Sequence, residues 1–396
     1  MTATSPPAIR PLDFLRIDEL FSDEELMIRD TVRAFVADQV LPYVGDWFEE
    51  ARIPLELAPA LGKIGVLGMH LSGYGCAGAS ATAYGLACME LEAGDSGLRS
   101  LVSVQGSLAM FAIHRWGSEE QKLEWLPRMA AGEAIGCFGL TEPDAGSDPG
   151  SMRTRARRDG SDWILHGQKM WITNGSAADV AVVWARTDED PPALRGFLVP
   201  RGTKGFSTQD IHRKMSLRAS VTSELLLDDV RLPASAQLPE ATSLRGPLSC
   251  LNEARYGIVW GAIGAARACF EAALQYSKER VAFGRPIAAT QLQQQKLAFM
   301  ALEVNRGALL ALHLGRMKDE GTLRPEQVSM GKLANVNAAL EVARSARQVL
   351  GANGITLEYP VIRHMNNLES VVTYEGTADV HALVVGGALT GFDAFR

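Results

Sequence analysis

The chain has 396 residues, of which 47% are hydrophobic and 21% charged, a composition typical of a water-soluble globular protein with two or three domains. Its formal net charge of −7, without a basic stripe that carries interleaved aromatic residues, argues against nucleic-acid binding. The five cysteines are odd in number, irregularly spaced and without a CxxC pair, which argues against a disulfide framework or a metal site.

The N-terminal third of the sequence shows helical patterns. Residues 1–20 resemble a loose leader, without the basic and apolar segments of a secretory signal. Ser22–Glu25 has a capping-box pattern, and apolar residues then recur at helical spacing until Pro42 stops the run. Further helical patterns cover residues 54–64, 81–93, 101–116 and 119–130. Together they predict an all-helical N-terminal domain, residues 1–135.

Gly73–Gly78 fits the GxGxxG pattern of dinucleotide-binding proteins, since it follows an apolar stretch and precedes a helical one. That function also requires a second strand with an acidic residue at its end, about twenty residues later. The acidic residues at that distance, Glu90, Glu92 and Asp95, lie on or just after a predicted helix, and no βαβ alternation follows. We therefore interpret the segment as a glycine-rich loop that leads into a helix.

From about residue 134 the composition shifts to Gly, Asp, Thr and Val. Short β-type runs at residues 163–166, 180–185, 196–199 and 224–227 alternate with turn residues, roughly one strand per eight to twelve residues. This spacing predicts a small β-barrel or β-sandwich domain, residues 136–240.

The remaining sequence is rich in Ala and Leu and has long helical patterns at residues 255–280, 291–319 and 325–350. Helices of this length with short connections pack as an antiparallel bundle, which predicts a four-helix bundle domain, residues 241–396. The most apolar window, residues 256–270, is short and contains Arg267, so we expect no membrane span. The order all-α, β, all-α predicts a multidomain α+β fold.

Two segments of the middle region combine hydroxyl and aromatic side chains with short strands. Cys137–Asp148 places Thr141 and Ser147 after a short apolar strand. Their hydroxyls and nearby backbone N–H groups could form hydrogen bonds with a polarised ring edge and a phosphate. Lys169–Asn174 places an aromatic residue and a hydroxyl on one further strand. Both segments are therefore candidates for ligand binding.

A third candidate is a carboxylate near the C-terminus. Two β-branched residues lead into Tyr374 and Glu375, and Gly376 breaks the chain directly afterwards. A carboxylate at such a joint has little side-chain freedom and can face a cleft. Taken alone, however, the segment is better explained by an exposed glutamate in a loop.

Arg99 is a fourth candidate. It follows a predicted helix stop at Gly94 or Gly97, where a solvated arginine is the usual case. The apolar sequel Leu101–Val104 indicates that Arg99 is at least partly buried, and a buried arginine requires a carboxylate partner.

In this order the segments resemble the acyl-CoA dehydrogenase family, and the resemblance runs from about Phe21 to Phe395. Glu92–Ser100 has the pattern Glu-x-x-Asp-Ser-Gly-x-Arg-Ser and is similar to glutaryl-CoA dehydrogenases in particular. The resemblance implies the all-α, β, all-α architecture, FAD as cofactor, a homotetramer, and electron-transfer flavoprotein as the partner that accepts electrons.

The resemblance implies that Glu375 is the general base that removes the α-proton of an acyl thioester. That proton is a very weak acid, so a carboxylate with a pKa raised by burial suits the task. The Glu375 backbone N–H would help to stabilise the enolate oxygen. Arg99 would hold a distal carboxylate of the substrate, because its planar guanidinium pairs bidentately with carboxylates. Glu92 and Tyr374 go with the decarboxylating type of glutaryl-CoA dehydrogenase, and we count all four residues as catalytic candidates.

The other implied contacts form two sets, of which each member taken singly is more often structural. For the flavin they are Phe138, Leu140, Thr141, Gly146, Ser147, Trp171, Ile172, Thr173, Arg280, Phe283, Gln291, Gln348, Gly351, Thr377, Asp379 and Phe395. For the substrate they are Arg99, Ser100, Ser147, Leu248, Leu251, Asn252, Arg255 and Gly376, with Arg255 as the main charge for the CoA phosphates. Three positions depart from the pattern: Ala352 replaces a glycine, Ala378 a histidine and Leu98 a tyrosine of close relatives.

The sequence thus predicts FAD-dependent α,β-dehydrogenation of glutaryl-CoA, with decarboxylation to crotonyl-CoA and CO2. The alternatives are a dehydrogenase of glutaryl-CoA or another carboxyacyl-CoA without loss of CO2, an acyl-CoA oxidase, and a non-enzymatic CoA- or flavin-binding protein. The retained Glu375 argues against the last. We expect a cytoplasmic protein without a membrane, metal or nucleic-acid partner.

Overall fold

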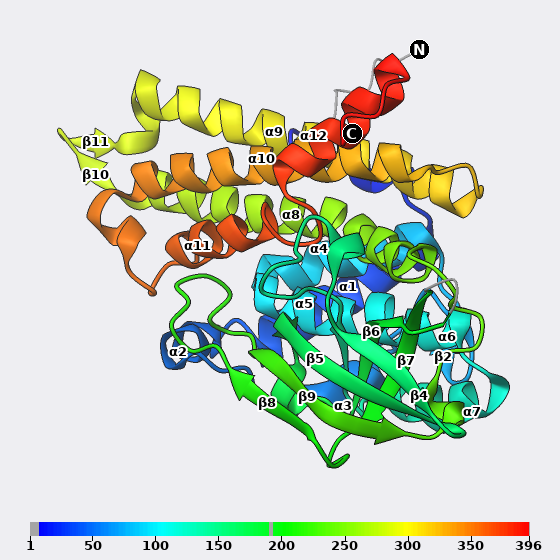
Figure 1. Ribbon diagram of the computed structural model, residues 1–396. Helices are drawn as coiled ribbons and strands as arrows, with labels where there is room; N and C mark the ends of the chain where they lie inside the picture. The colour runs from blue at the N-terminus through cyan, green and yellow to red at the C-terminus, as the bar shows by residue number, and fades with distance from the viewer. Residues whose placement is uncertain (1–7, 190–192, 396) are drawn as a thin grey trace.

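The computed structural model describes residues 8–189 and 193–395. Figure 1 shows a sheet below and long helices above, with α1, α4 and α5 between them and α6 and α7 beside the sheet. The N-terminal part contains α1 (Asp23–Gln39), α2 (Val44–Glu50), α3 (Leu57–Lys63), α4 (Ala81–Gly94), α5 (Ser96–Ser103), the π-helical segment Val104–Met110, α6 (Phe111–Trp116) and α7 (Glu119–Ala130). The predicted capping box is confirmed, since the Ser22 hydroxyl accepts from Glu25 N at 3.2 Å and Glu25 Oε2 accepts from Ser22 N at 2.8 Å.

The expectation of a loose leader is wrong for residues 8–20, and residues 1–7 lie outside the described residues. Ile17–Leu20 forms a 3₁₀ turn, in which Ile17 is buried. Asp18 at this turn pairs with Arg29 of α1 at 2.7 Å. Apolar burial and this ion pair fix the segment against the helices.

The expectation that Arg99 follows the end of a helix is also wrong. α4 does end at Gly94, but only Asp95 separates it from α5. Asp95 is extended, with φ −164° and ψ 143°, and its carboxylate accepts from Gly97 N at 2.6 Å as the N-cap of α5. A single capping residue therefore starts the next helix, and Arg99 lies inside that helix.

The glycine-rich segment is a loop, as interpreted from the sequence. Strands β1 (Ser72–Gly73) and β2 (Cys76–Ala77) form a short antiparallel hairpin that precedes α4. Gly73 and Gly75 have φ values of 76° and 82°, which glycine adopts without steric cost. The segment belongs to no βαβ unit among the described residues.

The middle part of the chain forms one curled, mixed sheet of seven strands. These are β3 (Gly136–Gly139), β4 (Arg155–Asp159), β5 (Asp162–Thr173), β6 (Val180–Thr187), β7 (Leu194–Pro200), β8 (Phe206–Asp210) and β9 (Thr222–Leu232). Their order is β3-β6-β4-β5-β9-β8, and β7 pairs with β6 off this path. The predicted β runs are confirmed.

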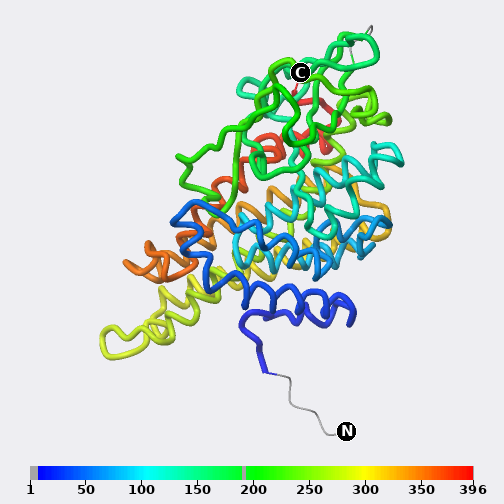
Figure 2. Tube along the Cα trace, turned by 90° about the horizontal axis from the view of Figure 1, so that it is seen from below, coloured from blue at the N-terminus to red at the C-terminus, as the bar shows by residue number. Residues whose placement is uncertain are grey.

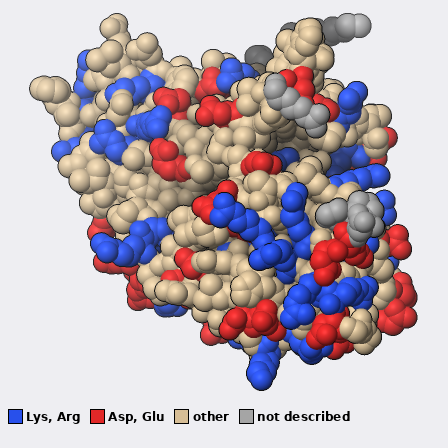
Figure 3. Space-filling model, viewed as in Figure 1, with Lys and Arg blue, Asp and Glu red and all other residues tan. Residues whose placement is uncertain are grey.

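Lys, Arg, Asp and Glu side chains are interspersed on the face of the molecule shown in Figure 3.

The C-terminal part consists of long helices. They are α8 (Arg245–Glu279), α9 (Gln291–Asp319), α10 (Pro325–Leu350), α11 (Val361–Val371) and α12 (Ala378–Thr390), with the small hairpin of β10 (Val281–Ala282) and β11 (Arg285–Pro286) between α8 and α9. The hairpin lies at one extremity of the molecule (Figures 1 and 2). The predicted bounds of α9 and α10 are confirmed, and α8 begins earlier than predicted, at Arg245. The predicted α+β fold with helical, sheet and helical parts is confirmed.

α8 and α9 are long and apolar enough to cross a membrane by length and composition alone. Core helices of globular proteins pass the same test, and most of the apolar part of α8 is buried in the fold. The absence of a membrane span stays a prediction.

A buried carboxylate, Glu90 of α4, joins three helices. It accepts hydrogen bonds from Arg33 of α1 at 2.9 and 3.0 Å and from Arg267 of α8 at 2.7 Å, and it is only 2% exposed. Burial alone would raise its pKa, but Arg267 and Arg33 outweigh burial and lower the pKa of Glu90 to about 2.

Glu90→Gln should therefore lower the free energy of unfolding by about 3 kcal/mol at neutral pH. The folded state keeps this carboxylate ionised at lower pH than the unfolded state does. The stabilisation is thus complete above the ordinary pKa of 4.5 and is lost as pH falls towards 2. Urea unfolding at pH 7 and pH 3 measures the loss of stability in Glu90→Gln. Glu341→Gln, which removes a carboxylate from an exposed ion pair, is the control. A destabilisation by Glu90→Gln that is equal at both pH values would contradict the prediction.

Candidate active site

Glu375 lies in the turn between α11 and α12. Its φ is 53° and that of Gly376 is 100°, so both residues are left-handed. This conformation costs a residue with a side chain about 1–2 kcal/mol, and such strain is typical of functional sites. A Cβ on Gly376 would lie 2.8 Å from His381 Nε2, so glycine is required there. Thr377 ends the turn by capping α12, since its hydroxyl accepts from Val380 N at 3.2 Å.

The carboxylate of Glu375 is buried although the residue as a whole is only half-buried. Its Oε2 atom has no hydrogen-bond partner among the described residues. Burial raises the pKa of Glu375, and the positive charges of Arg99, Lys332 and Arg255 oppose this effect. An unpaired carboxylate with a raised pKa, whose ionised form nearby cations favour, is suited to removing a proton.

Two cations bind the backbone of this turn. Arg255 of α8 donates from Nε to the Glu375 carbonyl at 2.7 Å and from Nη1 to Asn252 Oδ1 at 3.2 Å. Lys332 of α10 donates from Nζ to the Tyr374 carbonyl and, at 2.7 Å, to the Gly376 carbonyl. Residues of α8 and α10 therefore fix the turn from outside.

Arg99 lies beside the same turn and is 1% exposed. Its Nε donates to Glu92 Oε2 at 2.7 Å, and its Nη2 donates to the Tyr374 hydroxyl. Glu92 also accepts from Ser96 Oγ at 2.8 Å, and Ser100 Oγ lies 3.4 Å from the Tyr374 hydroxyl. Arg99 Nη1 donates no hydrogen bond within residues 8–189 and 193–395. The fold thus brings together Glu92, Arg99, Ser100, Tyr374 and Glu375, and leaves one guanidinium nitrogen for a ligand.

The loop after β3 is anchored by a buried ion pair. Lys169 Nζ donates to Glu142 Oε1 at 2.8 Å and to the Leu140 carbonyl at 3.1 Å. Glu142 also accepts from Arg153 N at 2.6 Å and from Thr154 N at 2.9 Å. The loop between these contacts, which carries Gly146 and Ser147, is exposed at both residues.

β5 presents an indole beside this loop. Met170 N donates to the Thr141 carbonyl at 2.9 Å, which places Thr141 next to the end of β5. Trp171 has a φ of 64° at a register shift of β5, and the residue is 55% exposed. Ile172 points the other way and is buried with 3% exposed. The structure thus brings together Thr141, Trp171 and the half-buried Thr173, with an exposed aromatic surface that fits a planar ring.

Three family models match consecutive parts of the chain. The acyl-CoA dehydrogenase N-terminal domain matches residues 22–133, the middle domain residues 137–230, and the C-terminal domain residues 245–390. The chain belongs to the acyl-CoA dehydrogenase family. It is therefore an oxidoreductase and a flavoprotein with FAD as its cofactor.

This acyl-CoA dehydrogenase is similar to the following proteins along nearly its whole length. The mitochondrial short-chain specific acyl-CoA dehydrogenase of Bos taurus is 34% identical over 391 residues, which cover 96% of this chain and 94% of the relative. A crystal structure of a glutaryl-CoA dehydrogenase from Mycobacterium smegmatis in complex with FADH2 is 63% identical, and a second crystal structure from that organism is 66% identical. Both cover 98% of this chain and 100% of the other, with a TM-score of 0.96.

The predicted flavin contacts of this acyl-CoA dehydrogenase differ in how they can act. Phe138 and Leu140 are buried in the core that includes Trp184, and Ile172 is buried within the sheet. Their side chains pack in these cores and expose little surface to a cofactor. Trp171, Thr141 and Thr173 keep free surface, and these residues would hold the ring of FAD.

Five predicted flavin contacts lie away from the Glu375 turn. Arg280, Phe283 and Gln291 are at the β10–β11 end of the bundle, and Gln348 and Gly351 are at the end of α10 (Figure 1). All five are exposed, and Phe283 is fully so, with a φ of 51°. Their contact with FAD therefore stays a prediction.

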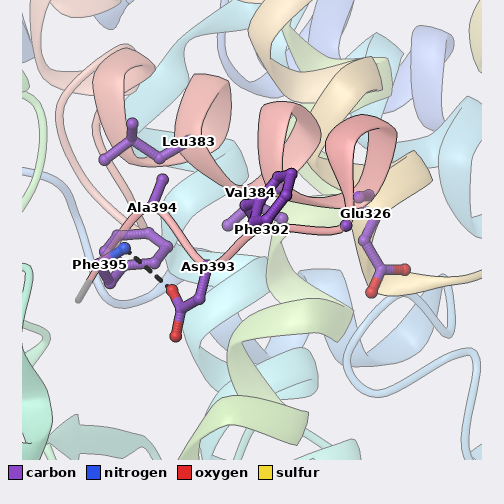
Figure 4. A pocket seen from close by; sticks show the side chains of 10 residues that line it. Glu326, Leu383, Val384, Phe392, Asp393, Ala394 and Phe395 are labelled. Carbon is purple, nitrogen blue, oxygen red and sulfur yellow. Dashed lines mark hydrogen bonds between the residues drawn. The ribbon is translucent and has the colours of Figure 1, made fainter.

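The last three predicted flavin contacts lie on or against α12. Thr377 caps this helix, and Asp379 is exposed in its first turn. The C-terminal segment folds back along α12, so that Phe395 lies near Leu383 at a shallow cavity of about 350 Å³ (Figure 4). Phe395 is 57% exposed. Its contact with FAD also stays a prediction.

The predicted CoA contacts follow one side of α8. Leu248, Leu251, Asn252 and Arg255 are all half-buried and recur at helical spacing, which places them along one face. Arg255 is the member that reaches the Glu375 turn. The structure therefore brings Arg255 to the candidate base and places the other three along the same helix.

The sequence analysis missed two residues of this centre. Lys332 is a single lysine in the Ala-rich helix α10, and its pattern is the same as that of a solvated helix face. Gly261 of α8 leaves room for the Glu92 carboxylate, since a Cβ there would lie 2.0 Å from Glu92 Oε2. The spacing of Gly257 and Gly261 in α8 was a usable signal, because glycines four residues apart allow another element to approach a helix closely.

Proposed function

We propose that this acyl-CoA dehydrogenase oxidises glutaryl-CoA and decarboxylates the product to crotonyl-CoA and CO2. Arg99 carries the proposal: its guanidinium is fully buried, contacts the Glu375 turn through Tyr374, and retains one nitrogen for a ligand. A distal carboxylate on the acyl group pairs well with such an arginine, whereas an apolar acyl tail does not. The high identity to the Mycobacterium smegmatis enzyme supports the same substrate.

The proposed reaction begins at Glu375. Its carboxylate takes the α-proton, and the electron pair of the broken C–H bond moves towards the thioester oxygen, which the Glu375 backbone N–H would stabilise. Bound FAD supplies the acceptor for the β-hydrogen, which leaves as a hydride. Arg99 keeps the distal carboxylate of the acyl group fixed, so that the α-carbon faces Glu375. The product of oxidation alone is glutaconyl-CoA.

Decarboxylation would follow in the same site. The bond to the distal carboxylate breaks, CO2 leaves, and the electron pair remains on the crotonyl skeleton as a dienolate. Protonated Glu375 returns its proton to the γ-carbon, which yields crotonyl-CoA. Glu92 and Tyr374 support this step, because both hold Arg99 and both go with the decarboxylating type in the resemblance.

We further propose that electrons pass to electron-transfer flavoprotein, that the protein acts in the cytoplasm, and that four chains assemble. Exposed apolar side chains on α9 and α12, with Leu292 71%, Leu302 62% and Leu389 77% exposed, support assembly, because such surface is usually covered. Light scattering should give about four times the 42.7 kDa mass of one chain.

The test is anaerobic turnover with glutaryl-CoA or butyryl-CoA and an artificial electron acceptor. We expect bleaching of the flavin, and crotonyl-CoA with CO2 from glutaryl-CoA. Release of glutaconyl-CoA would show that the enzyme oxidises glutaryl-CoA without decarboxylating it. Preference for butyryl-CoA would mean that Arg99 has only a structural role. Fast turnover with oxygen as acceptor would indicate an oxidase instead. A purified protein without flavin that takes up no FAD would overturn the whole proposal.

A further inference from the structure

Lys332 lies in the N-terminal third of α10 and packs against the turn that carries Glu375. It is 1% exposed. Its Nζ donates to the carbonyls of Tyr374 and Gly376 and lies 5.7 Å from the centre of the Tyr374 ring. The carbonyl between these two, that of Glu375, accepts from Arg255. Two cations therefore bind three successive carbonyls.

This arrangement determines where the Glu375 side chain points. Glu375 and Gly376 are both left-handed, a conformation that is unfavourable for the glutamate and accessible to the glycine. The turn lies between the ends of α11 and α12. The bonds from Lys332 reach the peptide group before Glu375 and the one after Gly376, and the bond from Arg255 reaches the peptide group between Glu375 and Gly376. Lys332 and Arg255 together fix the peptide planes on both sides of Glu375, and with them the direction in which the carboxylate leaves the backbone.

Lys332 also contributes to the charge around the Glu375 carboxylate. The charged or titratable groups that face it are Glu375 and Tyr374 in the turn, Arg99 on α5, Arg255 on α8 and His381 on α12. Burial lowers the pKa of Lys332 to about 7, while the Glu375 charge favours its protonated form. Burial lowers the pKa of His381 to about 3, so His381 is neutral at working pH. Protonated Lys332 in turn favours the ionised form of Glu375.

We propose that Lys332 is a positioning residue for the base: it holds the Tyr374–Gly376 turn by two carbonyls and places a positive charge near the Glu375 carboxylate. The inference rests on the proposed role of Glu375 and is independent of which acyl group the enzyme oxidises. A lysine that only supports the fold would stabilise the turn. It would not set the pH below which the base loses its charge.

The experiment measures kcat against pH for the FAD-loaded enzyme with glutaryl-CoA and an artificial acceptor. In Lys332→Met, the pH below which kcat falls should rise by about one unit, which lowers kcat about tenfold on the acid side. KM should change by less than about threefold, because Lys332 does not touch the substrate. Lys332→Gln should show the same shift, since it also lacks the charge. Lys332→Arg should restore the wild-type pH dependence.

A second lysine offers a matched control. Lys214, between β8 and β9, also donates from Nζ to two backbone carbonyls, those of Leu217 and Ser220. Lys214→Met should lower the melting temperature without changing the pH dependence of kcat. An unchanged pH dependence in both Lys332→Met and Lys332→Gln, or an equal shift in Lys332→Arg, would overturn the proposal. If Lys332→Met fails to retain FAD, Lys332→Gln decides.

The same data separate this inference from the proposed function. If the wild-type enzyme oxidises butyryl-CoA and not glutaryl-CoA, the proposed substrate is wrong, and the pH dependence with butyryl-CoA still decides the role of Lys332. If Glu375→Gln keeps its full rate, Glu375 is not the base, and the proposal that Lys332 positions the base is also wrong.

Discussion

Glu375→Gln is expected to lower kcat by up to about 10⁴-fold, because it removes the group that takes the α-proton while it preserves the size of the side chain. The variant should still bind FAD, since Glu375 lies in the turn before α12 and the exposed indole of Trp171 belongs to β5. The flavin absorbance spectrum of the purified variant and single-turnover bleaching with glutaryl-CoA measure both properties.

The pH dependence of the wild-type enzyme gives a second measure of the same residue. Burial raises the pKa of Glu375, although Arg99, Lys332 and Arg255 oppose it. The base is ionised above this pKa and protonated below it, so kcat should fall with decreasing pH at a pH above the ordinary value of 4.5. Glu369→Gln is the matched control, because it makes the same change at a glutamate of α11 that pairs with Arg344 at the surface. A full rate in Glu375→Gln would show that another group is the base.

The ends of α1, α9 and α10 could be predicted closely from the sequence because local chemistry marks them, whereas α2, α11 and α12 were not predicted individually. Gly321 and Pro325 separate α9 from α10, and the capping box at Ser22 starts α1. These signals act within one turn of a helix and do not depend on the rest of the fold. The order of the strands could not be predicted in this way. β3 and β4 both pair in parallel with β6, and such pairing depends on packing between distant segments.

The same distinction applies to the candidate site. Glu375 and Arg99 were found because their neighbours form ordered motifs in the sequence. The contacts that support them come from far along the chain: Tyr374 is 275 residues from Arg99, and Arg255 is 120 residues from Glu375. Lys332 has no motif at all, and only the packing of α10 against the turn shows its position. Sequence patterns therefore indicate the candidate catalytic residues, and tertiary contacts indicate the residues that orient them.

Arg99→Met should lower kcat/KM for glutaryl-CoA by about 10²- to 10³-fold, because loss of one partner of a buried, hydrogen-bonded charge pair costs 2–5 kcal/mol. The kcat/KM for butyryl-CoA, which has no distal carboxylate, should change much less. The ratio of the two kcat/KM values is therefore the measurement, since a general defect of the active site lowers both.

A purely structural role for Arg99 predicts a different result, and a double variant separates the two. Arg99→Met leaves the Glu92 carboxylate, which is 0% exposed, without its cation, and this should cost about 3–5 kcal/mol of stability. Glu92→Gln removes the orphaned charge, so Arg99→Met with Glu92→Gln should regain much of that stability. If Arg99 binds the substrate, the double variant is stable and still discriminates poorly between glutaryl-CoA and butyryl-CoA. If Arg99 serves only to neutralise Glu92, the double variant recovers the preference for glutaryl-CoA together with stability, which would refute the assigned contact.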